Sequence, residues 1–407
     1  MVPEGWHTKQ VSDVCHLKNG HGFKPEEWDT QGLPIIRIQN LNGSQNFNYF
    51  SGEPEQDWLV PSGQMLFAWA GTKGVSFGPT IWKGKTGVLN QHIFKVFAKK
   101  SIDEDWLYYC LQHVTHRIER RAHGFKATLV HVKKSEIDNQ LVLVPSFEEQ
   151  KRIAQVLLTW DRAIETIEKL IENSECQKKS LMQKLLSPSE RLSEFSDPWA
   201  EVHVADMGTV VGGGTPDSDE PTYWGGDILW ATPTDVTALK SRYIFSTSKN
   251  ISKLGLKNSA ARLLPKGALL MCTRATIGDL AIAEEPIATN QGFKSLIPNK
   301  RYDVDFLYYL FTYNKHVFKR NACGSTFVEL SKHDFEKQRL LVPSLAEQKS
   351  IASVLNSASA EIETLKIQLG LLNQEKSALM QQLLTGERRV QVDAAVGQLM
   401  KGATASG

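Results

Sequence analysis

The sequence predicts an α+β protein in which two mixed α/β units follow each other along the chain, each followed by a long helix. The first observation behind this prediction is a repeat: "LVPSFEEQKRIAQVL" begins at Leu143 and "LVPSLAEQKSIASVL" begins at Leu341. A repeat at a fixed spacing indicates a duplicated structural unit. The second is that apolar residues recur at coiled-coil spacing after both segments. We therefore expect the two helices to pair as an antiparallel coiled coil with pseudo-twofold symmetry.

The predicted divisions of the 407-residue chain follow this repeat. The first α/β unit occupies residues 1–145, and the first long helix occupies residues 146–187. A linker and the second unit occupy residues 188–343, and the second helix occupies residues 344–386. Residues 387–407 are rich in small side chains and are predicted to form a flexible tail.

Composition places the chain among ordinary globular proteins. It is 41% hydrophobic and 23% charged, and its net charge of +2 neither requires nor excludes a nucleic-acid partner. The sequence contains no run of eighteen apolar residues and no secretory signal, so we expect no membrane association. Its five cysteines are odd in number and widely spaced. This pattern argues for a reducing, cytoplasmic location and against a zinc ribbon or a disulfide framework.

Both predicted helices carry clear start and stop signals. Each opens on an S-x-x-E capping box, at Ser146 in the first copy and at Ser344 in the second. Pro188 follows the end of the first helix, and Gly386 follows the end of the second. About forty residues lie between these signals, which corresponds to about 60 Å of helix. This length favours projecting rods over two core helices of a single bundle.

Apolar residues along both helices alternate by four and three positions, as in the seam of a coiled coil. Both copies place a lysine at one position of this seam, Lys178 and Lys376, where a polar residue costs stability and can fix the register. The apolar positions predicted to pair the helices and to dock partners are Ile153, Leu157, Ile164, Ile167, Ile171, Leu181, Leu185, Ile351, Leu355, Ile362, Leu365, Leu369, Leu372, Leu379 and Leu383.

The two α/β units combine short strand-like runs with loops rich in glycine and proline. Runs such as "LPIIRI", "QMLFAW", "ALLMC" and "DLAIA" are predicted strands. An amphipathic helix closes each unit, near Asp103–Arg121 and Asp303–Arg320, and ends in basic residues. The repeat extends into the units, because "LNQHIFKV" at Leu89 matches "TNQGFKSL" at Thr289.

Basic and polar residues of the loops and helix ends are candidates for contacts with DNA phosphates and bases. Phe77 and Trp82 lie among these lysines, as expected of a loop that probes a groove. Two alternatives stay open, because basic residues also suit the dipole at a helix C-terminus and the loops could be ordinary surface turns. The candidates are Lys73, Lys83, Lys85, Arg117, Arg120, Arg121, Lys126, Thr215, Arg274, Lys315, Lys319 and Arg320.

The sequence carries no recognisable catalytic signature. "GKT" at Gly84 lacks the glycine that a phosphate-binding loop needs five positions earlier, where Pro79 stands. "GGGTP" at Gly212 does not have dinucleotide-binding spacing, and the histidines form no convincing metal set. We therefore expect no catalytic residue, metal or cofactor in this chain, and a role in binding and scaffolding.

The arrangement as a whole resembles the specificity subunit of type I restriction-modification enzymes. The resemblance rests on the repeated "LVPS-x-x-EQ", on "GGGTP…YWGGDILW" early in the second unit and on "D-x-D-(F/W)-LYY" in both closing helices. It implies that each unit is a target recognition domain that reads one half of an asymmetric, two-part DNA site. It also implies that the paired helices act as a ruler for the gap between the halves.

The resemblance further implies that catalysis resides in partner subunits. Two modification subunits would dock on the helices and methylate adenine with S-adenosylmethionine, and restriction subunits would add translocation and cleavage that depend on ATP and Mg. The first unit departs from the family pattern, since "NGHGFKPEEW" near Asn19 stands where the second has "GGGTPDSDEPTYW". An adaptor that binds proteins through a coiled coil, with no DNA specificity, is the main alternative, and a degenerate enzyme is a third.

Overall fold

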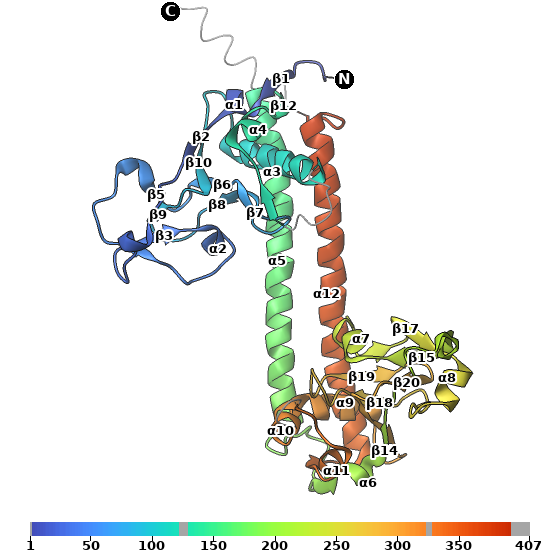
Figure 1. Cartoon of the computed structure of the whole chain (residues 1–407). Helices are drawn as coiled ribbons and strands as arrows, with labels where there is room; N and C mark the ends of the chain where they lie inside the picture. The colour runs from blue at the N-terminus through green and yellow to red at the C-terminus, as the bar shows by residue number, and fades with distance from the viewer. Residues whose placement is uncertain (1, 122–128, 323–327, 392–407) are drawn as a thin grey trace, which may run out of the picture. The chain divides into compact units, whose positions relative to one another are not determined.

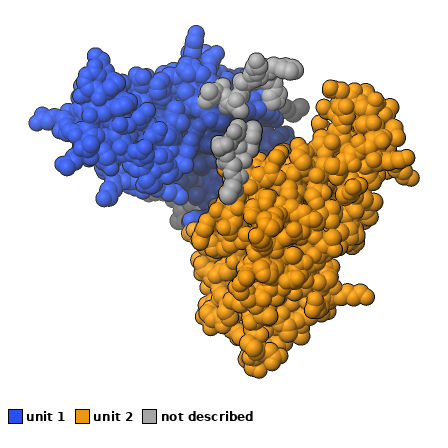
Figure 2. Space-filling model, turned by 60° about the horizontal axis from the view of Figure 1, so that its bottom comes forward, with its two compact units in different colours: residues 1–167, 368–407 blue, residues 168–367 orange. Residues whose placement is uncertain are grey.

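The computed structural model describes residues 2–121, 129–322 and 328–391. The chain forms two compact units, shown in Figure 2: unit 1 comprises residues 1–167 with 368–407, and unit 2 comprises residues 168–367. The boundary divides both long helices near their middles. Each unit therefore contains one α/β domain and one half of each long helix.

The α/β domain of unit 1 contains two four-stranded sheets, with strand orders β2-β10-β6-β8 and β4-β3-β9-β5 (Figure 1). Two strand pairs, β1-β12 and β7-β11, complete it. The elements are β1 (His7–Gln10), α1 (Val11–Val14), β2 (Cys15–Asn19), β3 (Leu33–Ile36), α2 (Ile38–Leu41), β4 (Tyr49–Phe50), β5 (Leu59–Val60), β6 (Met65–Ala68), β7 (Ala70–Thr72), β8 (Gly78–Ile81), β9 (Gly87–Leu89), β10 (Ile93–Ala98), α3 (Glu104–Arg121), β11 (Leu129–His131), α4 (Lys134–Asp138) and β12 (Leu141–Val144).

The α/β domain of unit 2 has a five-stranded sheet, β14-β21-β18-β19-β16, a three-stranded sheet, β17-β15-β20, and the pair β13-β22. Its elements are β13 (Ala200–His203), α6 (Val204–Met207), β14 (Gly208–Gly212), β15 (Trp224–Ala231), α7 (Pro233–Thr237), β16 (Tyr243–Ile244), β17 (Lys249–Ile251), α8 (Lys253–Lys257), β18 (Leu269–Met271), β19 (Leu280–Ala283), β20 (Ile287–Thr289), β21 (Lys294–Pro298), α9 (Val304–Tyr313), α10 (Lys315–Arg320), α11 (Lys332–Glu336) and β22 (Arg339–Val342).

Both domains mix helices and sheets as the sequence predicts, with one difference in the closing helices. The first is continuous as α3, but the second is broken into α9 and α10 at Asn314. The side-chain amide of Asn314 donates a hydrogen bond to the carbonyl of Leu310 at 2.8 Å, and such local bonds make asparagine a poor residue for a helix interior. The single helix predicted over Asp303–Arg320 is therefore wrong at this point. Within the described residues, no helix is both long and apolar enough to span a membrane.

The long helices are α5 (Phe147–Leu185) and α12 (Leu345–Thr385). At their starts, the serine hydroxyls of the capping boxes accept hydrogen bonds from the Glu149 and Glu347 amides, at 3.3 and 3.4 Å. After α12, Gly386 adopts a φ of +73°, the left-handed conformation that commonly ends a helix. The structure therefore uses the serines and Gly386 as predicted, but the glutamates of the predicted capping boxes bind other partners with their carboxylates.

Within each unit, the halves of the two long helices share a hydrophobic core with the closing helix. In unit 1, Leu157 of α5 and Leu383 of α12 belong to one buried cluster with α3, and in unit 2, Leu185 and Ile351 belong to one cluster with α9. All fifteen predicted seam positions are buried or half-buried. Three apolar residues of the same helices outside the predicted seam, Leu170, Ile367 and Leu371, are instead 44–60% exposed.

The two seam lysines have different surroundings. Lys376 forms an ion pair of 2.5 Å with Asp161, which also accepts a hydrogen bond from the Tyr109 hydroxyl. Lys178 lies 5.5 Å from the centre of the Tyr309 ring, and no ion pair joins it to a carboxylate in the described part of the chain. Burial lowers the pKa of Lys178 from its ordinary value. The seam is therefore charge-compensated at this position in unit 1 but not in unit 2.

The repeated capping-box glutamates are buried and bind the same two kinds of partner in both units. In unit 1, Glu149 is paired with Arg389 at 2.6 and 3.0 Å and accepts a hydrogen bond from the Trp6 indole at 3.0 Å. Trp6 precedes β1, and Arg389 follows α12. We call this arrangement, together with its counterpart in unit 2, the glutamate clamp. It joins the first strand of the domain, the start of one long helix and the segment after the other.

The clamp of unit 2 uses Glu347, Arg191 and Trp199. The Arg191 guanidinium donates to both carboxylate oxygens of Glu347, at 3.0 and 2.5 Å, and the Trp199 indole donates to it at 3.3 Å. Glu347 is only 1% exposed. A carboxylate at this depth is stable only when hydrogen bonds and a cation compensate for lost water, so the clamp is required by the burial itself.

The glutamine after each clamp glutamate fixes the closing helix of the domain. Gln150 accepts a hydrogen bond from the Asp103 amide at 2.9 Å and donates to the Pro145 carbonyl at 3.1 Å. Gln348 makes the corresponding bonds to Asp303, at 2.9 Å, and to Pro343, at 3.0 Å. In the repeated "EQ", the glutamate therefore forms the clamp and the glutamine holds the start of the closing helix.

The segment after α12 takes part in unit 1. Arg389 belongs to the clamp, Val390 packs against the core of unit 1, and a side chain at Gly386 would collide with Pro3. Gly386 precedes the segment predicted as a flexible tail, but Arg389 and Val390 lie within it and are held against unit 1, so the prediction is wrong for these residues. Residues 392–407 lie outside the described part of the chain.

Replacing Glu149 by alanine is expected to destabilise unit 1 by about 1–3 kcal/mol, because the buried Trp6 indole loses its acceptor. Denaturant unfolding of the full chain measures this change. The neighbouring variant Glu148→Ala is the matched control: Glu148 is exposed and pairs with Lys151 at the surface, so its loss should change stability by less than about 0.5 kcal/mol. Equal effects of the two variants would contradict the clamp.

Candidate nucleic-acid interface

A glycine after the second strand of each domain packs on the same turn. Gly20 donates to the Ile93 carbonyl at 3.1 Å, and Gly213 donates to the Phe293 carbonyl at 3.4 Å. A Cβ added at either glycine would collide with the carbonyl oxygen of Asn90 or Asn290. The "NGHGF" and "GGGTP" segments therefore occupy equivalent positions in the two domains. The first unit differs from the family pattern in sequence here, but its glycine makes the same contact.

The turn on which these glycines pack is Asn-Gln in both units. The amides of Asn90 and Asn290 each donate at 3.0 Å to the end of a neighbouring strand, at the carbonyls of Ile36 and Ala231. The next residues, Gln91 and Gln291, are exposed. We name this feature the NQ turn. It was not among the predicted contacts, although the matching "NQ" of the two units was the signal that could have identified it.

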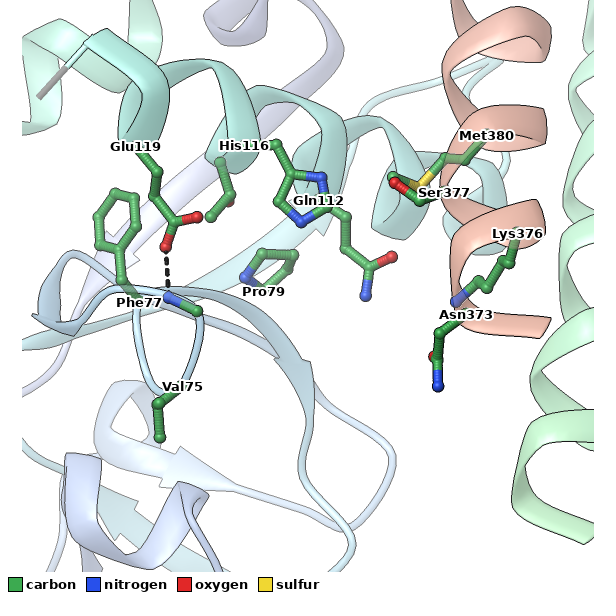
Figure 3. A pocket seen from close by; sticks show the side chains of 12 residues that line it. Val75, Phe77, Pro79, Gln112, His116, Glu119, Asn373, Lys376, Ser377 and Met380 are labelled. Atoms are coloured by element: carbon green, nitrogen blue, oxygen red, sulfur yellow. Dashed lines mark hydrogen bonds between the residues drawn. The ribbon is translucent and has the colours of Figure 1, made fainter. Parts of the chain in front are cut away.

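The predicted lysines of unit 1 lie on exposed turns. Lys73 is at the turn between β7 and β8, and Lys83 and Lys85 are between β8 and β9. The first turn is held to α3, because the Gly74 amide donates to the buried Glu119 carboxylate at 2.8 Å, as Figure 3 shows. A pocket of about 290 Å³ lies beside this turn, between α3 and α12.

Phe77 and Trp82 do not probe a groove. They are 7% and 6% exposed, and the Trp82 indole donates to the carbonyl of Lys85 at 2.8 Å. Their rings belong to the cores beneath the two turns. Their burial argues against the expectation of a loop that presents both lysines and aromatic rings to a groove, because these rings anchor the turns that expose the lysines.

The basic end of α3 is divided between internal and exposed residues. Arg117 is half-buried and donates to the Leu141 carbonyl at 2.6 Å, and burial lowers its pKa. This placement argues against the predicted phosphate contact of Arg117. Arg120 and Arg121 are exposed on the last turn. Lys126 lies outside the described residues.

In unit 2, two of the predicted cations are engaged in ion pairs. Arg274 is 2.6 Å from Glu329, which also pairs with Lys294 at 3.1 Å. Burial opposes the charge of Glu329, but the hydrogen bonds from Lys294 and Arg274 outweigh it and lower the pKa of this carboxyl group. Lys315 pairs with Asp279.

The remaining candidates of unit 2 are more open. Lys319 and Arg320 are exposed on the last turn of α10, and Thr215 is exposed with its hydroxyl bonded to the Gln291 side chain. Across the described residues, no group of three or more His, Cys, Asp or Glu side chains could hold a metal ion. The candidate interface thus consists of exposed cations and polar side chains on turns and at the ends of α3 and α10.

These features define a duplicated protein, in which two unlike α/β domains are attached to the long helices by the same kind of contact. The chain belongs to the type I restriction modification DNA specificity domain family, whose sequence pattern matches residues 3–174 and 196–372.

Individual relatives agree with this membership. A putative type I restriction enzyme MjaX specificity subunit from Methanocaldococcus jannaschii is 25% identical over 96% of this chain and 95% of its own length. The MjaIX specificity subunit of the same organism is 40% identical over 46% of this chain, a match that spans 44% of that relative. The crystal structure of an S subunit from M. genitalium has the same fold, with a TM-score of 0.56, 17% identity and coverage of 94% of this chain and 96% of that one.

His113 on α3 is half-buried and provides a test of the electrostatics around this helix. Burial, followed by the charges of Arg117, Arg120 and His116, lowers its pKa from 6.5 to about 4. The unfolded chain therefore binds more protons between these values, and His113 makes the free energy of unfolding fall as pH falls from about 6.5 to about 4. The expected result for His113→Tyr, which places in unit 1 the residue found at Tyr313, is a flatter dependence of thermal stability on pH in this window. An unchanged slope would contradict the burial of a neutral histidine.

Proposed function

We propose that this chain supplies DNA sequence specificity to a type I restriction-modification complex, and that its two domains read the two halves of an asymmetric site. Membership of the specificity family supports the first part. The second part is supported by the two domains themselves, which share the NQ turn and the glycine packed on it but carry different cations around them. Different surroundings of a common framework suit two unlike half-sites.

The long helices would set the distance between the two half-sites. In unit 1, Glu149 at the start of α5 pairs with Arg389 beyond the end of α12, and Asp161, further along α5, pairs with Lys376 within α12. The partner's residue number therefore falls as the number along α5 rises. In unit 2, Glu175 pairs with Lys366 and Arg191 pairs with Glu347 in the same sense. These contacts support an antiparallel coiled coil with pseudo-twofold symmetry, which acts as a ruler.

Two modification subunits would dock on the repeated helices, because a duplicated surface offers two nearly equivalent sites. Methylation with S-adenosylmethionine, and cleavage driven by ATP with Mg, would belong to these partners and to the restriction subunits. The near-neutral charge of +2 supports dependence on partners, since phosphate contacts by basic residues supply most non-specific DNA affinity. Lys73, Lys83, Lys85, Arg120, Arg121, Lys319 and Arg320 are the exposed cations that would make such contacts.

The observation that carries the proposal is the repeated clamp. Each domain is attached to the start of one long helix and to the segment after the other by the same buried glutamate. A domain held at two points cannot swing freely about either helix. The length of the helices would therefore be transmitted to the spacing of the half-sites.

Inserting one heptad after Ile167 and one after Ile367 tests the ruler while keeping the seam in phase. The two insertions lie at the boundary between the compact units. Seven residues add about 10.5 Å of helix, which corresponds to about 3 base pairs of DNA. Sequencing methylated adenines in a host that carries the chain and its methyltransferase partner should show unchanged half-sites and a gap longer by about 3 base pairs.

Two residues inserted at the same two positions provide the control, because they turn the predicted seam to nearly the opposite face of each helix, by about 200°, and should weaken assembly. An active complex with the heptad insertions and an unchanged gap would overturn the ruler. Sequence-specific methylation that does not depend on this chain would overturn the proposed function itself.

A further inference from the structure

The NQ turn places the same exposed side chain at the same position of both domains. Main-chain hydrogen bonds show that the two glutamines of the NQ turns occupy equivalent positions. The residue after each glutamine, His92 or Gly292, accepts a hydrogen bond at its carbonyl from the amide of Trp69 or Thr273. Some side chains shared by the two units are buried and hold the fold, as Gln150 and Gln348 do. Gln91 and Gln291 are exposed instead.

The neighbours of the two glutamines differ between the units. In unit 2, the Thr215 hydroxyl is bonded to the Gln291 side chain, and a Cβ at Gly292 would lie 3.7 Å from the Cβ of Arg274. Gln291 therefore lies among predicted DNA contacts from two other loops. In unit 1, the equivalent positions are Gly22 and Ala70, which offer no polar side chain. The glutamine is kept while the groups around it change.

The same glutamine with different neighbours in the two domains indicates what it can recognise, and this argument rests on the proposed function. If the two domains read unlike half-sites, side chains that differ between them discriminate the bases that differ. A side chain that is identical and held in the same backbone frame suits a base that both half-sites contain. A glutamine amide offers one donor and one acceptor, the pattern that matches N6 and N7 of adenine in the major groove.

We infer that Gln91 and Gln291 each recognise an adenine that is common to the two half-sites. The fixed turn supports this role, since the main-chain carbonyl of Gln91 accepts a hydrogen bond from the Trp69 indole at 3.2 Å and the NQ turn is tied to a neighbouring strand. A recognition side chain on such a turn starts close to its bound position and loses little entropy on binding. In unit 2, the exposed Thr215 hydroxyl, which is bonded to the Gln291 side chain, would then contact the base beside the adenine.

The test uses the full chain with its methyltransferase partner and maps methylated sites in a host without other adenine methylation. Gln91→Ala and Gln291→Ala should each relax one base position in one half-site only, with discrimination lost by about 5- to 150-fold. Gln91→Glu keeps the size of the side chain but lacks the amide donor, so it should have the same effect as Gln91→Ala. Gln45→Ala is the matched control, because Gln45 is an exposed glutamine of the same domain whose side chain bonds to the Gly43 carbonyl.

The outcomes separate the inference from the proposed function. A wild-type complex that methylates a two-part site, with variants of unchanged site preference, would overturn the inference alone. Slower methylation with unchanged preference would also overturn it, since the glutamines would then contribute to binding but not to base recognition. Failure of the wild-type chain to confer any sequence preference would overturn the proposed function. Thermal unfolding of each variant, expected within about 0.5 kcal/mol of wild type, excludes loss of folding as the cause.

Discussion

The burial of two carboxylates, Glu149 and Glu347, is the constraint on which the rest of the structure depends. Each lies almost without access to water, so a cation and further hydrogen-bond donors must replace the lost water. The tryptophan that precedes the first strand and the arginine that follows the other long helix provide them. A domain can therefore satisfy its own glutamate only when both helices are in place. In each unit, the same kind of buried contact therefore connects the α/β domain to both long helices.

The helices could be predicted from the sequence because their signals are local. Capping serines, heptad spacing and stop residues all lie within the segments that they define, and the burial of the seam follows from them. The clamp could not be predicted in the same way, since Glu149 and Arg389 are 240 residues apart and Glu347 and Arg191 are 156 apart. A signal existed, because Arg191 and Arg389 match at the same shift of 198 as the helices themselves.

The candidate site was harder to predict, because residue type does not say where a side chain points. Basic residues were sensible candidates, yet Arg117, Arg274 and Lys315 are engaged within the protein, while neighbouring cations are exposed. Trp82 was expected at the surface and is buried as the support of its turn. The glutamines of the NQ turn were missed because they carry no charge. Comparing the two α/β units of the chain identifies exposed residues that both units share, and residue charge alone cannot identify them.

The proposed function requires two domains that read two unlike half-sites at a fixed separation. Mapping methylated adenines in a host that carries this chain with its methyltransferase partner measures this directly. We predict a single site type, with two different specific halves on either side of a gap of constant length and unspecified sequence. A continuous site, two identical halves or a gap of variable length would contradict this function.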